Sequence, residues 1–275
     1  MAEHASVSIK FDMENLKEYN GEKVKGDQDI FGVLFKDGAE IRIKSVADFE
    51  GFKCRIWAPE FQGILLDSAI RDAKEAEILR KSLVYKNSEF DGVRELEDSI
   101  DNTKNSYRVM QLAMSCMSSS INSVEAWINK IIQSEIACTL VFHRLNGSKV
   151  EWGANRIEED LSTGEKIFNV IPAIFGINPI QPHVTSRQRF NQLISERNAI
   201  VHLKNTPKIG DHKSKRANLA LKLLRRNSLL VPKNTISMIR LLHEKSGRDI
   251  PAWLAENIGA LCAAESEVKK YLTRR

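Results

Sequence analysis

The sequence predicts an α+β protein, in which a small antiparallel β-rich N-terminal domain precedes a C-terminal α-helical bundle. Apolar and charged residues alternate near the N-terminus, as in half-buried strands, whereas from residue 104 onwards apolar residues recur in steps of three and four. Between these regions, residues 86–105 are mostly polar and acidic and show neither the strand nor the helix periodicity. We therefore expect a β-rich accessory domain over residues 1–90 and a helical domain over residues 104–275.

The N-terminal strands are expected on either side of a tight turn. In DIFGVLFKDGAEIRIKSV, two apolar runs flank Asp37-Gly38, a dipeptide that favours hairpin turns, and Ile41 and Ile43 then alternate with charged residues. The segment GFKCRIW alternates in the same way. A helix is expected over residues 67–85, where charged residues separate apolar ones at helical spacing.

The helical domain is expected to open with one long amphipathic helix over residues 104–138. The apolar positions that define it are Met110, Ala113, Met114, Met117, Ile121, Val124, Ile128 and Ile131. A shorter helix should begin near Ser162, with Glu165 in capping-box position, and end near Gly176. The next helix should begin at Thr185 or Ser186, and two more are expected over residues 232–246 and 251–273.

Composition indicates a soluble, cytoplasmic protein. The chain has 275 residues, of which 42% are hydrophobic, enough for a sizeable core, and no apolar run is long enough to span a membrane. Its N-terminus lacks the pattern of a secretory signal. The four cysteines are scattered and suggest reduced thiols in the core, and no spacing of histidines or acidic residues is typical of a metal site. We expect no metal and no cofactor.

Charge is distributed unevenly along the chain. Residues 1–196 hold 24 Lys and Arg against 30 Asp and Glu, a net charge of −6, whereas residues 197–275 hold 17 against 6, a net charge of +11. A basic segment of this kind attracts a polyanion such as RNA, or an acidic protein partner. The alternative is a solvated basic face without a partner.

The basic segment begins in a stretch with unusual polar residues, ISERNAIVHLKN. Arg197, Asn198 and His202 interrupt aliphatic neighbours on a predicted helix. Asn198 and His202 are about 40° apart around such a helix, but Arg197 and His202 are about 140° apart. The arginine and the histidine can therefore share a site if the arginine reaches round the helix end, or if the groups meet across a helix pair in a homodimer.

The string RNAIVH resembles the R-N-x-x-x-H signature of HEPN (higher eukaryote and prokaryote nucleotide-binding) domains. The upstream SVEAWINKII also resembles the first long HEPN helix, and the order of helices agrees over about residues 104–275. The resemblance implies an α-helical bundle that dimerises and forms one composite cleft from both protomers. It further implies metal-independent RNA cleavage. The N-terminal region resembles no family.

The resemblance assigns a role to each residue of the motif. Arg197 would bind and polarise a phosphate, His202 would act as acid and base, and Asn198 would orient His202 or contact the substrate. Glu125 and Asn129, one turn apart on the first helix, would support the motif. The alternative for these two residues is ordinary helix-surface polarity or hydrogen bonding between helices.

A basic cluster follows the motif and offers a track for RNA. Its members, together with a lysine of the motif helix, are Lys204, Lys213, Lys215, Arg216, Lys222, Arg225 and Arg226. The sequence thus favours a HEPN-type endoribonuclease of a toxin or antiviral-defence system, acting as a homodimer, with a neutralising or regulatory protein as a further partner. Two alternatives stay open: a HEPN-like module that binds RNA, a nucleotide or a protein without cutting, and an oligomerisation scaffold for the N-terminal domain.

Overall fold

The computed structural model describes residues 29–35, 38–49, 52–57, 60–87, 94–201 and 218–273. The chain divides into two compact units, Met1–Glu60 and Phe61–Arg275. This division precedes the first helix, whereas the sequence placed the boundary between residues 90 and 104.

The described part of the first unit is a small sheet of three strands. They are β1 (Asp29–Phe35), β2 (Gly38–Phe49) and β3 (Phe52–Trp57), antiparallel and in the order β1-β2-β3. Phe35 is paired with Gly38 at one end of β1–β2, and Phe49 with Phe52 at the joined end of β2–β3. The sheet is therefore a meander in which each strand pairs with its neighbour in sequence.

The predicted α+β fold class, with its β-rich N-terminal domain, is wrong, because the protein is mostly helical. A 22-residue helix, α1 (Phe61–Ser82), occupies a large part of the span assigned to that domain, and it packs along the helices of the second unit. The alternation of apolar and polar residues coincides with three short strands, whereas the buried apolar residues that the structure describes lie in the helical unit and form its core.

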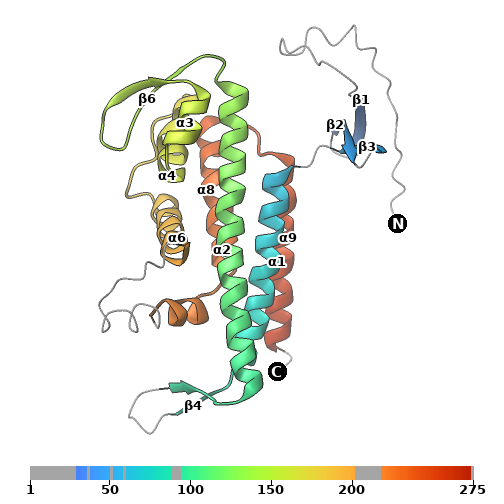
Figure 1. Ribbon diagram of the computed structural model, residues 1–275, viewed down its shortest axis with the longest axis vertical. Helices are drawn as coiled ribbons and strands as arrows, with labels where there is room; N and C mark the ends of the chain where they lie inside the picture. Colours follow the sequence, from blue (N-terminus) through green and yellow to red (C-terminus); the bar gives the residue numbers. More distant parts are fainter. Residues whose placement is uncertain are drawn as a thin grey trace. The chain divides into compact units, whose positions relative to one another are not determined.

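The second unit consists of helices with two short hairpins between them (Figure 1). After α1 come β4 (Tyr85–Asn87), β5 (Arg94–Leu96), α2 (Ile100–Glu135), β6 (Leu140–His143), β7 (Lys149–Trp152), α3 (Ala154–Asp160), α4 (Thr163–Glu165), the π-helix η2 (Lys166–Val170), α5 (Ile171–Ile174), α6 (Thr185–Val201), α8 (Leu230–Ser246) and α9 (Ala252–Thr273). Residues 218–225 are also helical. Each hairpin, β4–β5 and β6–β7, is a two-stranded antiparallel sheet.

The 36-residue helix α2 is the centre of the helical unit. In Figure 1 it runs the length of the unit, with α1 and α9 on one side and the elements from α3 to α6 on the other. Its apolar stripe is buried against these neighbours, and Met117, Ile121, Val124 and Ile128 are almost inaccessible to solvent. Burying one such side chain contributes roughly 1.5–3 kcal/mol. The spacing of apolar residues therefore predicts which side of α2 faces the core.

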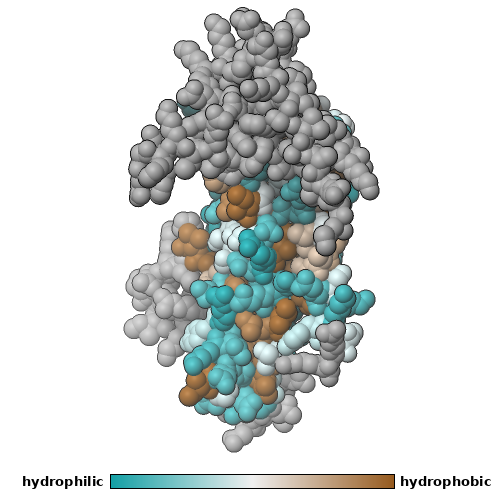
Figure 2. Space-filling model, turned by 90° about the vertical axis from the view of Figure 1, so that its right-hand side faces the viewer, coloured by the Kyte–Doolittle hydropathy of each residue, from teal (hydrophilic) through white to brown (hydrophobic). Residues whose placement is uncertain are grey.

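Small residues let helices α1, α2 and α9 approach one another closely. The Ser123 hydroxyl on α2 donates a 2.6 Å hydrogen bond to the carbonyl oxygen of Gln62 on α1. A methyl group at Gly63 would lie 3.1 Å from Cβ of Trp253 on α9, which is tighter than an ordinary contact. The face that carries α1 and α9 is mostly hydrophilic at its surface, with separate apolar patches (Figure 2).

The described cysteines differ in exposure, although the sequence suggested that the cysteines lie in the core. Cys116 is buried in the core, where burial raises the pKa of its thiol, but Cys138 and Cys262 are exposed. Burial is therefore not a shared property of these residues. Within the described ranges, no helix is both long and apolar enough to cross a membrane.

Candidate functional site

The helix α6 carries the described part of the sequence motif. Arg197 and Asn198 lie near its C-terminal end, both half-buried. The other predicted residues of the motif and of the basic cluster lie outside the described residues: His202, Lys204, Lys213, Lys215 and Arg216. The structure brings Arg197 to Glu125 of α2, and it places Lys222, Arg225 and Arg226 in a separate pocket.

Arg197 turns inward, toward α2. Its spacing from the buried residues Phe190 and Leu193 puts it on the core-facing side of α6. Nη2 of Arg197 lies 3.4 Å from Oε1 of Glu125, and their side chains are 20% and 35% exposed. Nε of Arg197 is buried and makes no hydrogen bond with any described residue. The guanidinium is thus held by one carboxylate while part of its donor capacity is unused.

Glu125 connects α6 to the short helices after the β6–β7 hairpin. Its Oε1, the atom next to Arg197, also accepts a hydrogen bond from the hydroxyl of Thr163, the first residue of α4. Ser162, the residue before, caps the same helix, and its Oγ accepts a 3.2 Å hydrogen bond from the N–H of Glu165. The predicted capping box therefore fixes the segment from which Thr163 reaches Glu125.

A buried lysine adds a second cation to this network. Lys166 is only 6% exposed. Its Nζ donates a 2.7 Å hydrogen bond to the carbonyl oxygen of Glu158 and lies 3.4 Å from Oδ1 of Asn129. Burial lowers the pKa of Lys166, and the negative charges of Glu125 and Glu158 partly oppose that shift. Asn129 thereby acts between helices rather than as surface polarity.

The backbone around Lys166 is irregular. Lys166 is the first residue of η2, a five-residue π-helix set between α4 and α5. Turns of π-helix are rare and occur often at functional sites, because they displace side chains from the regular helical positions. All five residues of η2 are buried, including the polar Asn169, whose Nδ2 donates a 2.6 Å hydrogen bond to the carbonyl oxygen of His143.

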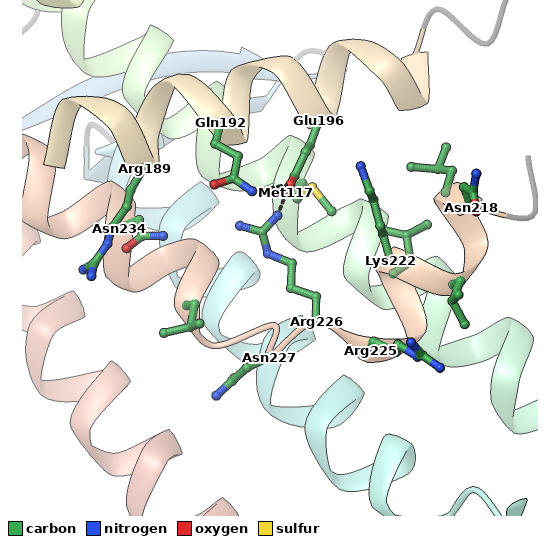
Figure 3. Close-up of a pocket in the computed structure, with 14 residues that line it drawn as sticks. Met117, Arg189, Gln192, Glu196, Asn218, Lys222, Arg225, Arg226, Asn227 and Asn234 are labelled. Atoms are coloured by element: carbon green, nitrogen blue, oxygen red, sulfur yellow. Dashed lines mark hydrogen bonds and ion pairs between the residues drawn. The ribbon is translucent and has the colours of Figure 1, made fainter. Parts of the chain in front are cut away.

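A pocket of about 830 Å³ lies beside the adjoining face of α6 (Figure 3). Residues 218–225, the loop after them and the first turns of α8 form its other walls. Its polar lining residues are Arg189, Gln192, Glu196, Asn218, Lys222, Arg225, Arg226, Asn227 and Asn234. Its apolar lining residues are Met117, Leu219, Leu221, Leu223 and Leu230. The lining thus contains four cationic side chains and one carboxylate.

The one carboxylate of this lining is paired across the pocket. Arg226 extends from its loop to Glu196 on α6, as the dashed contact in Figure 3 shows, and both side chains are about one-fifth exposed. Gln192 donates a 2.9 Å hydrogen bond to the other oxygen of Glu196. The Arg226–Glu196 pair is therefore largely buried. Arg189, Lys222 and Arg225 are exposed, and no described carboxylate forms an ion pair with them.

The loop that carries Arg226 is fastened to α1. The N–H of Ser228 donates a 2.6 Å hydrogen bond to Oε1 of Glu77, which is buried. The other oxygen of Glu77 is paired with Arg80, and Nη1 of Arg80 donates a 3.0 Å hydrogen bond to the carbonyl oxygen of Arg225. These contacts hold one wall of the pocket in place without using any side chain that lines it.

Sequence reasoning did not identify Thr163, Lys166 or Arg189. For Arg189, a signal existed: with Gln192 and Glu196 it forms a polar series at spacings of three and four, which predicts one polar face of α6. The burial of Lys166 has no comparable signal, because the residues that cover it come from other elements.

Comparisons with protein-family models, with curated proteins and with solved structures found no match for this chain. Among the described residues, no three His, Cys, Asp or Glu side chains come together as a possible metal site. The features that bear on function are therefore the sequence motif, the Arg197–Glu125 contact and the pocket beside α6.

Proposed function

We propose that this protein is a metal-independent endoribonuclease of HEPN type, which cuts RNA at a site built from Arg197, Asn198 and His202. The observation that carries the proposal is the environment of the Arg197 side chain. Its guanidinium is held by Glu125 in a half-buried position, with an unused buried donor, near the end of α6. Val201, the last residue of α6, is directly followed in sequence by His202.

The residue types suit cleavage by the ribose 2′-hydroxyl. A neutral imidazole at His202 takes the proton from the 2′-oxygen, which attacks the adjacent phosphorus, and the bond to the 5′-oxygen of the next nucleotide breaks. The leaving oxygen takes up a proton, and the products are a 2′,3′-cyclic phosphate and a free 5′-hydroxyl. Arg197 binds the phosphate and its developing charge, since a guanidinium can offer two parallel N–H donors.

The proposed active form is a homodimer in the cytoplasm. The helical spacing of positions 197 and 202 in the sequence corresponds to about 140°, which favours a site completed by groups from two protomers. Val201 is 57% exposed, which leaves an apolar side chain for a partner protomer. A toxin or antiviral-defence setting, with a neutralising or regulatory protein, belongs to the same proposal.

A second candidate function is favoured by a specific contact. Because Arg197 is already paired with Glu125 and only 20% exposed, it resembles a structural ion pair as much as a phosphate ligand. In that case the helical unit binds RNA, a nucleotide or a protein without cutting, and the exposed cations near α6 supply the attraction.

A cleavage assay in EDTA separates the two functions. Purified protein is incubated with mixed RNA and compared with Arg197→Ala, His202→Ala and a control variant, Arg71→Ala, which removes an exposed arginine paired with Asp67 on α1. The ribonuclease proposal expects cleavage by wild type and by the control, with loss of at least about 100-fold in both motif variants, typical of an acid-base or electrostatic group.

Equal cleavage by wild type and both motif variants, or none from any protein, refutes the ribonuclease. RNA binding without cleavage supports the second candidate. Size-exclusion chromatography at micromolar concentration tests the dimer, and a monomer that still cleaves RNA contradicts the composite site.

A further inference from the structure

The pocket beside α6 has the composition of an anion site. Four of its lining side chains are cationic and one is acidic, and the acid is already neutralised by Arg226. Arg189, Lys222 and Arg225 therefore remain as cations that no described carboxylate balances. In Figure 3, Arg189 and Lys222 lie on either side of the Arg226–Glu196 pair. An uncompensated group of like charges at one concave surface favours a ligand of opposite charge.

The pocket's size and remaining lining indicate the rest of the ligand. Small-molecule sites typically occupy roughly 300–1,000 Å³, and this pocket of about 830 Å³ lies within that range. The side-chain amides of Asn218, Gln192 and Asn234 offer both donors and acceptors, and leucine side chains offer apolar surface. The lining has no aromatic side chain. Ring stacking on a base is therefore absent, and the phosphate dominates binding.

One wall of the pocket is preformed. The contacts of Glu77 and Arg80 on α1 hold the loop of residues 225–228 without the ligand. A site whose walls are ordered in advance loses less conformational entropy when it binds. The first backbone N–H groups of α8 are already bonded to Asn227 and Ser228, so the anion must be held by side chains rather than by the helix end.

We propose that this pocket is a binding site for a phosphorylated nucleoside, with the phosphate between Arg189 and Lys222 and the sugar and base against the amides and leucines. The shared chemistry is a phosphate on a nucleoside, free or within an RNA strand. The inference that the phosphate belongs to an RNA strand rests on the proposed function, whereas the inference that the pocket binds a phosphate does not. Because the cationic side chains contact the phosphate, which every nucleotide carries, most of the affinity is common to the four bases.

The test is a binding measurement in which cleavage cannot occur. A fluorescein-labelled ten-nucleotide RNA with 2′-O-methyl groups lacks the attacking hydroxyl and is titrated by fluorescence anisotropy. ATP, AMP and inorganic phosphate are used as competitors. Arg189→Gln combined with Lys222→Gln removes two exposed charges, and Lys233→Gln removes one charge from α8 at a residue outside the lining.

The double variant should raise the Kd of the oligonucleotide about 100-fold, since each lost charge-assisted contact is worth about ten-fold. It should also reduce the slope of log K against log salt by about 0.7, the value for one neutralised phosphate on a single strand. The Lys233→Gln control should bind like wild type. Glu196→Gln, which removes the pocket's one negative charge, should bind the oligonucleotide several-fold tighter. A variant that merely disrupted the fold would bind it more weakly.

The competitors identify the source of the phosphate. Displacement by ATP and AMP supports a free nucleotide, whereas displacement only by unlabelled oligonucleotide supports a unit of an RNA strand. An unchanged Kd and salt slope in the double variant, or no gain with Glu196→Gln, overturns the site. Since the oligonucleotide cannot be cut, failure of the wild-type protein to bind it refutes the pocket, whereas binding by a wild-type protein that does not cleave unmodified RNA refutes only the ribonuclease.

Discussion

Glu77 offers a direct test of how the pocket wall is held. It is 3% exposed, and its carboxylate accepts the N–H of Ser228 at 2.6 Å while pairing with Arg80. Glu77→Ala removes both contacts at once. A buried donor left without a partner costs about 1–3 kcal/mol, and removing one partner of a buried ion pair costs about 3–5 kcal/mol. Because Arg80 is 19% exposed and keeps some access to water, we expect the lower end, about 3 kcal/mol.

The assay is thermal unfolding followed by circular dichroism. In a domain of about 150–250 residues, 1 kcal/mol shifts Tm by about 2–4 °C, so Glu77→Ala should lower Tm by about 6–12 °C. The control is Glu75→Ala, which removes the same side chain two residues earlier on α1, where it is 48% exposed and paired with Arg108. An exposed pair contributes about 0–1 kcal/mol, so its Tm should fall by less than about 4 °C. A Glu77→Ala protein no less stable than the Glu75→Ala protein would refute the reasoning.

Two further predictions concern packing and pH. Gly63→Ala should lower the free energy of unfolding by about 1–3 kcal/mol, because the new methyl group lies 3.1 Å from Cβ of Trp253. Gly259→Ala meets nothing within 4 Å and should raise the free energy of unfolding by up to about 1 kcal/mol. Urea denaturation measures both values, and the reverse order of stability contradicts the packing. Burial lowers the pKa of His243, so below the usual histidine pKa of about 6.5 the unfolded chain binds more protons than the folded one. The free energy of unfolding should therefore fall as pH drops from about 6.5 through the folded-state pKa. Urea denaturation between pH 7 and pH 5 should show this dependence in the wild type and a weaker one in His243→Leu.

The helices of the second unit follow from local patterns in the sequence. Apolar steps of three and four on α2 identified its buried side, because helix geometry alone brings those positions to one face. The capping box at Ser162 is similarly local. Such features are predictable because residues a few positions apart determine them.

The fold class and the site geometry depend on contacts over longer distances. Alternating residues near the N-terminus indicated strands, but they did not show that these strands are short compared with helices such as α1 and α2. The Arg226–Glu196 pair joins residues 30 positions apart, and the contact of Thr163 with Glu125 joins residues 38 positions apart. Neither pair has a local pattern that selects it from the many other possible pairs of charged or polar residues.

Stability alone does not account for the two ion pairs of α6. The pair of Arg226 with Glu196 is largely removed from water and the pair of Arg197 with Glu125 partly so, and burying such a pair costs desolvation energy that its attraction only partly repays. Well-packed apolar residues at these positions would serve the bundle at least as well. Charged side chains on two faces of one helix are explained more directly if one face binds the phosphate that is cut and the other binds a neighbouring nucleotide, so that α6 positions RNA at both.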